Sequence, residues 1–163
     1  MIVLGIDPGL ATVGFGVIKK GGNSIEALDY GVIKTPANEG LPTRLLTIYN
    51  AIAQLINTYK PDSVAVEELF FNNNAKSAIK VAQARGVSVV AAIKECGNIY
   101  EYTPLQIKQA LTGYGRAEKS QIQYMVQHIL KLKKIPTPVD AADALAVAIT
   151  HIQTNQLLSK TRM

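Results

Sequence analysis

The chain has 163 residues, 48% hydrophobic and 18% charged, which is typical of one globular domain and excludes a largely disordered chain. No apolar run reaches the roughly 18 residues needed to span a membrane, and the N-terminal apolar stretch is too short for a signal peptide and has no basic region before it. The net charge is +5 and there is one cysteine, so no internal disulfide can form, and we expect a reduced, cytoplasmic protein.

The first part of the chain predicts a meander of three strands. Residues 2–7 read as a buried strand and residues 13–20 as a second one. Gly21-Gly22-Asn23 is a strong turn signal that leads into a third strand near residues 25–35. We therefore expect these strands to pair antiparallel.

Helices and strands alternate after the meander. Pro42 suits the first turn of a helix whose apolar spacing continues to Tyr59. The β-branched residues at 63–67 are typical of a parallel strand covered on both faces. The remaining predicted elements are a helix at 75–94, a strand at 99–102, and helices near 104–112, 117–132 and 139–153. The pattern predicts one α/β domain with a mixed sheet over residues 1–153, and a polar tail that frays at residues 154–163.

Four acidic residues occupy positions where burial is expected. Asp7 ends the first strand and Glu67 ends the fourth, which a crossover helix commonly returns beside the first. Asp140 and Asp143 share one face of a helix that is otherwise made of Ala, Leu, Val and Ile. Buried carboxylates are costly unless a cation pairs with them. The set therefore predicts a site for Mg²⁺ or Mn²⁺, and two such ions about 4 Å apart can promote phosphodiester hydrolysis.

The remaining charge suits a polyanionic partner. If these four acids share one site, 17 basic residues face only 8 other acids, a net charge of +9. An acidic pocket on a basic body fits a nucleic acid held through its phosphates. A mildly basic protein with no such partner is the simpler alternative.

Each acid also has a simpler interpretation that stays open. Asp7 before a Pro-Gly turn is a candidate turn cap, and Glu67 is a candidate strand-end charge with Glu68 beside it. Asp140 follows Pro138 and suits a helix N-cap. None of these alternatives accounts for Asp143, one turn deeper in its helix.

At these positions the sequence resembles the RuvC Holliday junction resolvases, over roughly residues 2–153. The actin-like kinases share the first of the matching motifs, so the last three carry the likeness. The matching motifs, in order, are Gly5-Ile6-Asp7-Pro8-Gly9, Val66-Glu67 with Phe70, Gln83-Ala84-Arg85-Gly86, Gly113-Tyr114-Gly115-Arg116-Ala117-Glu118-Lys119-Ser120-Gln121 and Asp140-Ala141-Ala142-Asp143-Ala144-Leu145-Ala146.

The resemblance implies a fold, an activity and partners. The fold would be ribonuclease-H-like, with a five-stranded mixed sheet flanked by helices. The protein would be a homodimer, with the helix from Ala75 at its interface, that nicks two opposed strands of four-way junction DNA and leaves 5′-phosphate and 3′-hydroxyl ends. The family works with the RuvA and RuvB branch-migration proteins in recombination and repair.

The resemblance also implies roles for individual residues. The four acids match the metal ligands, with two Mg²⁺ ions per site expected. Lys108 and Lys119 match basic residues near the scissile phosphate, although a solvated helix face explains such lysines equally well. Phe70 matches an aromatic residue that stacks on bases, with a core phenylalanine as its alternative. Less certain DNA contacts are expected at Phe71, Lys76, Lys80, Arg85 and Arg116.

Other functions fit the sequence less well. A related nuclease acting on RNA or other branched DNA is the nearest alternative. An actin-like phosphotransferase needs a second domain, for which this chain is too short, and a purely DNA-binding protein gains nothing from carboxylates that face phosphates. His151 lies eight residues beyond Asp143, about 12 Å along the helix, too far to ligate the same metal.

Overall fold

The computed structural model describes the backbone of residues 1–69 and 74–161, and the side chains of these residues up to Asn155. The strands are β1 (Ile2–Asp7), β2 (Thr12–Gly21), β3 (Ser24–Lys34), β4 (Ser63–Glu67) and β5 (Ile99–Tyr102). The helices are α1 (Leu41–Tyr59), α2 (Ala75–Glu95), α3 (Pro104–Thr112), α4 (Lys119–Ile129) and α5 (Val139–Thr161). Within the described residues, none of the helices is long and apolar enough to cross a membrane.

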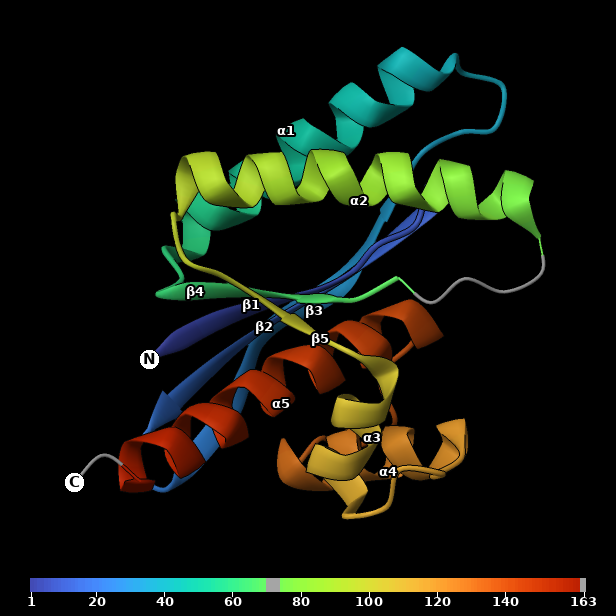
Figure 1. The fold of residues 1–163 in the computed structure, drawn as a ribbon. Helices are drawn as coiled ribbons and strands as arrows, with labels where there is room; N and C mark the ends of the chain where they lie inside the picture. Colours follow the sequence, from blue (N-terminus) through green and yellow to red (C-terminus); the bar gives the residue numbers. More distant parts are fainter. Residues whose placement is uncertain (70–73, 162–163) are drawn as a thin grey trace.

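The five strands form one mixed sheet in the order β3-β2-β1-β4-β5. β2 pairs antiparallel with both β1 and β3, and β4 pairs parallel with both β1 and β5. Figure 1 shows the sheet as the middle layer, with α1 and α2 on one side and α5, α3 and α4 on the other. The predicted α/β fold with a meander followed by parallel strands is therefore confirmed.

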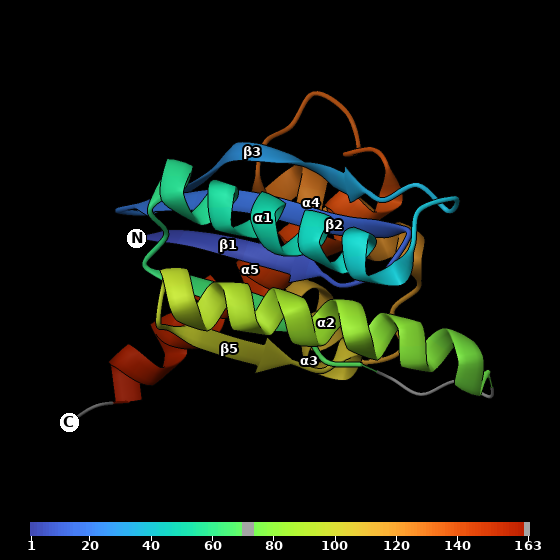
Figure 2. The ribbon, with the colours of Figure 1, turned by 90° about the horizontal axis from the view of Figure 1, so that it is seen from above.

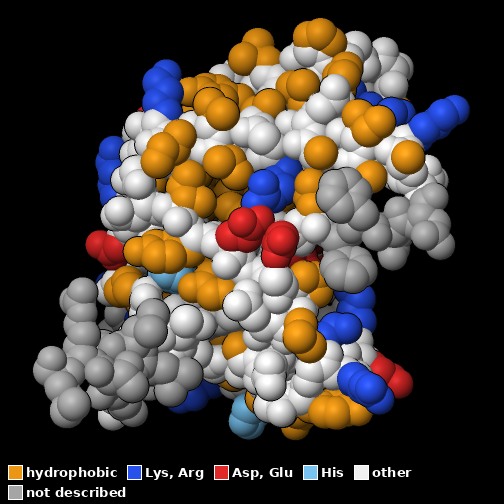
Figure 3. All heavy atoms as spheres, in the orientation of Figure 1, with side chains coloured by type: hydrophobic (Ala, Val, Ile, Leu, Met, Phe, Trp, Pro, Cys, Tyr) orange, Lys and Arg blue, Asp and Glu red, His pale blue; other side chains and the backbone are white. Residues whose placement is uncertain are grey.

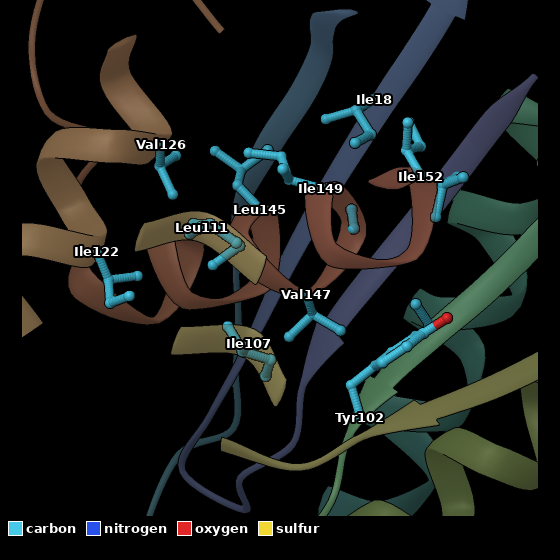
Figure 4. Packing of buried hydrophobic residues seen from close by; sticks show 14 of the residues in the cluster. Ile18, Tyr102, Ile107, Leu111, Ile122, Val126, Leu145, Val147, Ile149 and Ile152 are labelled. Atoms are coloured by element: carbon cyan, nitrogen blue, oxygen red, sulfur yellow. The ribbon is translucent and has the colours of Figure 1, made fainter. Parts of the chain in front are cut away.

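Apolar side chains fill both faces of the central strands. Along β1, Val3 packs into the core beneath α5, and the next residue, Leu4, packs into the core beneath α1 and α2. β4 alternates in the same way, which explains why its sequence is continuously apolar. Figure 2 shows α1 and α2 lying over the sheet, and Figure 4 shows side chains of α3, α4 and α5 meeting in the opposite core, with Tyr102 reaching in from β5.

Helix α5 approaches the sheet unusually closely, because glycines face it. A Cβ atom on Gly5 of β1 would lie 2.1 Å from the carbonyl oxygen of Ala144, and one on Gly14 of β2 would lie 2.0 Å from that of Asp140. Backbone therefore lies against backbone where a side chain would keep the two apart. This close approach places the first turns of α5 beside the end of β1.

Two helices differ in length from the prediction. α4 covers residues 119–129 and not 117–132, because a capping box from Glu118 to Gln121 starts it and Lys131, with a φ of 53°, lies in the left-handed region just beyond its end. α5 continues to Thr161, eight residues beyond the predicted end at 153. A polar sequence does not stop a helix that is already nucleated and packed, because each further residue adds a backbone hydrogen bond.

Candidate active site

Two neighbouring parallel strands bring Asp7 and Glu67 to the same edge of the sheet. Ile6 of β1 pairs with Val66 of β4, so the residue that follows each of them ends its strand at a matching level. Both carboxylates are half-buried. The crossover through α1 thus produces the juxtaposition that the sequence predicted.

Helix α5 supplies the other two acids from one side of its first turns. Asp140 lies in the first turn, where the helix dipole favours negative charge, but it is not the N-cap because the helix already begins at Val139. Oxygen atoms of Asp7, Asp140 and Asp143 all lie within 4.8 Å of one another. We call these three residues together with Glu67 the acidic cluster.

The acidic cluster is electrostatically unfavourable without a cation. Burial, followed by repulsion from Glu67, Asp143 and Asp140, raises the pKa of Asp7 from 3.8 to about 8. Burial also raises the pKa of the Glu67 carboxyl and that of Asp143. The interaction of Asp7 with Glu67 raises the pKa of Asp7 further, which favours a proton shared within the cluster. A proton here neutralises one of the negative charges, whereas a divalent metal ion would offset two.

Lys119 provides a positive charge beside the acidic cluster. Its Nζ atom lies 2.8 Å from Oδ2 of Asp143, and this hydrogen bond raises the pKa of the lysine. Lys119 and Lys108 line a pocket of about 210 Å³ together with Glu67 and Asp143. The remaining lining residues are Pro104, Ile107, Ile122 and Ala146. A negatively charged group in this pocket would therefore contact lysines and carboxylates at once.

The residues present fit a hard divalent cation. Within the described part of the chain, the donor set is made only of carboxylate oxygens, drawn from strand ends and a helix, which Mg²⁺ and Mn²⁺ prefer. The raised pKa of Asp7 and the ammonium group against Asp143 both indicate an excess of negative charge. Asp7, Glu67, Asp140 and Asp143 are the residues that would hold the ion.

The other residues predicted to contact DNA lie on α2 and on the segment before α4, or outside the described residues. Lys76 and Lys80 are exposed on the first turns of α2, and Arg116 is exposed before α4. Arg85 of α2 forms an ion pair with Glu101 of β5, so it also links two elements of the fold. Phe70 and Phe71 lie outside the described residues.

The glycines that let α5 come close were not among the predicted site residues. Gly14 pairs with Asp7 across β1 and β2 and lies directly under Asp140, so it belongs to the site although it has no functional group. A glycine inside a strand pattern is a signal of close backbone approach. The alternation of Gly14 and Gly16 in β2 carries that signal, but it does not reveal which helix approaches.

Comparison with known proteins gives a consistent match over almost the whole chain. Residues 3–151 match the family model described as "Crossover junction endodeoxyribonuclease RuvC". A protein of that name from Alkaliphilus oremlandii is 56% identical over 94% of each chain. Another from Clostridioides difficile is 52% identical over 96% of this chain and 93% of the relative.

Solved structures match the fold as well as the sequence. The structure of Thermus thermophilus RuvC with a Holliday junction substrate is 39% identical, with a TM-score of 0.92 over 98% of this chain and 97% of that one. The yeast mitochondrial Holliday junction resolvase is only 11% identical but has a TM-score of 0.72, which shows a shared fold. The fold is thus shared with these proteins over nearly the whole of this chain.

Proposed function

Because this chain belongs to the family of the crossover junction endodeoxyribonuclease RuvC, we infer that it is a metal-dependent nuclease that resolves Holliday junctions. The match covers residues 3–151, which include the whole acidic cluster. The relative from Thermus thermophilus, which was solved with a Holliday junction substrate, matches 98% of this chain.

One observation carries the catalytic part of this proposal. Three carboxylates from β1 and α5 place oxygen atoms within 4.8 Å of one another at a sheet edge, and Glu67 ends the adjacent strand. Folding half-buries these carboxyl groups and makes their ionised form unfavourable, as the raised pKa of Asp7 indicates. Such an arrangement destabilises an empty site and is useful when it binds cations.

The proposed reaction is hydrolysis of one phosphodiester bond in each of two opposed strands. A water oxygen forms a bond to phosphorus, the bond to the 3′-oxygen breaks, and the products carry a 5′-phosphate and a 3′-hydroxyl. Bound divalent ions, two per site in our proposal, supply activation of the water and stabilisation of the leaving oxygen. The four acids hold and orient those ions, with Mn²⁺ able to replace Mg²⁺.

Lys119 and Lys108 are both candidates for contact with the scissile phosphate in this scheme. Both line the pocket that reaches Glu67 and Asp143, so either can contact the phosphate oxygens of a strand that enters it. Ammonium groups at that position would offset charge that develops on the phosphate in the transition state. Lys119 would have to leave Asp143, 2.8 Å away, when a metal ion takes its place.

We propose a homodimer built on α2. This helix exposes more than half of the side chains of Ile79, Val90 and Ile93. Figure 3 shows apolar side chains gathered over the upper part of the molecule, where Figure 1 places α1 and α2. Covering these side chains with a second copy would remove apolar surface from water. Two active sites at a set spacing would favour a four-way branch over linear duplex DNA.

The proposal extends to further partners and contacts. RuvA and RuvB are the proposed branch-migration partners. Lys76, Lys80, Arg85 and Arg116 are proposed to neutralise phosphates of the junction arms. Phe70 and Phe71, after Glu67 in the chain, are proposed to stack on bases near the crossover.

A cleavage assay tests this function directly. A mobile four-way junction, a flap, a duplex and an RNA–DNA hybrid of matched sequence are incubated with the protein and Mg²⁺. We expect paired symmetric nicks in the junction alone, which Glu67→Gln abolishes and the neighbouring Glu68→Gln leaves intact. Cleavage mainly of the hybrid or the flap would favour a related nuclease, and full activity in Glu67→Gln would overturn the proposed site.

A further inference from the structure

His151 is a fully buried polar residue that the proposed chemistry does not use. It lies on α5 two turns beyond Asp143, with none of its side chain exposed to solvent. Its Nδ1 atom is 2.8 Å from the hydroxyl of Tyr102, and its Nε2 atom is 2.9 Å from the hydroxyl of Ser63. The amide nitrogen of Asn155 also lies 2.9 Å from Nε2. We call these four residues the histidine network.

The donors and acceptors of the histidine network are mutually consistent. In the assigned amide orientation, the Asn155 nitrogen can only donate, so Nε2 of His151 must accept. The ring proton then lies on Nδ1, which donates to the Tyr102 hydroxyl. Burial lowers the pKa of His151, which keeps the ring neutral as this pattern requires. The Ser63 hydroxyl also donates to Nε2 and shares its one lone pair with the Asn155 amide, so both ring nitrogens are hydrogen-bonded.

These bonds connect the helix that carries two acids to the strands that position a third. Ser63 is the first residue of β4, and Glu67 is the last residue of the same strand. Tyr102 is the last residue of β5 and pairs with Glu67 across the parallel ladder. His151 therefore holds α5 against both strands from one point on the helix.

Apolar packing alone would leave the position of α5 along its axis weakly defined. N-terminal to His151, α5 meets the sheet through the strand glycines and through apolar side chains that include Leu145, and hydrophobic contact is non-directional. Hydrogen bonds, in contrast, tolerate only small changes of distance and angle. A shift of α5 by even 1 Å would move Asp140 and Asp143 relative to Glu67.

We propose that His151, through Ser63 and Tyr102, is a positioning residue that sets the spacing of Asp143 and Asp140 from Glu67 for a divalent cation. This inference rests on the proposed metal-dependent function. Displacements of about 1 Å can lower catalysis by about 10²-fold, and loss of an orienting hydrogen bond commonly lowers metal affinity by about 10–100-fold. Because the histidine network acts at a distance of two helical turns, we expect a loss of metal affinity at the lower end of that range, about tenfold.

Isothermal titration calorimetry of the full chain with Mn²⁺ alone tests this inference. Tyr102→Phe removes only the hydroxyl that accepts from His151, and Ser63→Ala removes the hydroxyl at the other nitrogen. The matched control is Thr150→Val, next to His151 on α5. The Thr150 hydroxyl is equally buried, but it donates only to Ala146 of its own helix, at 2.8 Å.

We expect Tyr102→Phe and Ser63→Ala each to weaken Mn²⁺ binding about tenfold, and Thr150→Val to bind as the wild type does. The melting temperature and the affinity for uncleaved junction DNA, measured on the same samples, separate a loss of folding from a loss of position. Folded variants that all bind Mn²⁺ like the wild type, or an equal loss in Thr150→Val, would overturn the positioning role alone. A wild type that binds no Mn²⁺ would overturn the proposed function as well.

Discussion

Helix α5 carries two buried polar groups about two turns apart, the acidic cluster at its start and the histidine network further along. In the histidine network each ring nitrogen has a hydrogen-bond partner within 2.9 Å. In the acidic cluster several carboxylates share one small space, and only Lys119 forms an ion pair with them among the described residues. The first group stabilises the fold by itself, whereas the second requires a ligand. The acidic cluster therefore differs from the histidine network in that its buried polar groups remain unfavourable without a ligand.

The largest difference between the two groups is expected in catalysis. Asp7→Asn or Asp143→Asn should lower junction cleavage by about 10³-fold or more, because loss of a metal ligand removes several kcal/mol of transition-state stabilisation. Single-turnover cleavage of a four-way junction measures the effect. Asp29→Asn is the control, since the carboxylate of Asp29 on β3 accepts a hydrogen bond from the hydroxyl of Tyr59 on α1, away from the cluster. Cleavage by Asp143→Asn at the rate of Asp29→Asn would remove the distinction.

A divalent cation should stabilise the acidic cluster and leave the histidine network unaffected. At a free Mg²⁺ concentration of 100 times its Kd, linkage predicts about 2.7 kcal/mol of added stability. For a chain of this size, that raises the Tm by about 5–11 °C. Differential scanning fluorimetry with Mg²⁺ and then with excess EDTA measures the shift and its reversal. Asp7→Asn should lose most of it, and a shift of unchanged size in that variant would argue for binding elsewhere.

Removing one hydroxyl should destabilise the histidine network. Tyr102→Phe preserves the ring but leaves the Nδ1 proton of His151 without its acceptor, which should cost about 1–3 kcal/mol. The matched change in the acidic cluster, Asp7→Asn, should leave metal-free stability unchanged or raise it, because asparagine is neutral without the proton that the buried Asp7 carboxyl must take up. Urea unfolding of both variants in EDTA gives the comparison. A stability loss in Asp7→Asn as large as that in Tyr102→Phe would show that both groups are structural.

The two groups should respond to pH in opposite directions in the metal-free protein. Asp7 has a pKa of about 8 when folded and 3.8 as its ordinary value, so between these values the folded state holds a proton that the unfolded chain releases. Stability from Asp7 is therefore lost as the pH rises toward 8, by at most about 1.4 kcal/mol per pH unit for each proton. The raised pKa of Glu67 and that of Asp143 add the same sign.

The histidine network has the reverse dependence. The folded pKa of His151 lies below its ordinary value of 6.5, so the unfolded chain takes up a proton first as the pH falls below 6.5, and stability is lost toward acid. Urea unfolding between pH 5 and pH 9 in EDTA measures both limbs. We expect Asp7→Asn to flatten the alkaline limb and His151→Gln to flatten the acid limb. A wild-type profile that rises steadily to pH 9 would contradict the assignment of Asp7.

The element pattern and the acids were accessible from local sequence, whereas the contacts between them were not. Asp7 and Glu67 were predicted to lie together because apolar runs identify strands, and a crossover places β4 beside β1. The ion pair between Lys119 and Asp143 and the partners of His151 depend on where α4, α5 and β5 cross, which no local periodicity encodes. The predicted ends of α4 and the predicted C-terminal end of α5 were wrong for a related reason, because capping geometry and helix propagation decide where a helix begins and ends.

The sequence by itself therefore determined the order of strands and helices, the placement of acids at strand ends and on one helix face, and the excess of basic charge elsewhere. These features follow from periodicity and residue chemistry over a few neighbouring positions. Only the tertiary structure decided that α5 lies against Gly5 and Gly14, that Asp7 is destabilised as an anion, and that His151 anchors α5 to β4 and β5. Such properties arise from groups more than 40 residues apart in the chain, whose distance and shared burial exist only after the sheet and its covering helix have packed.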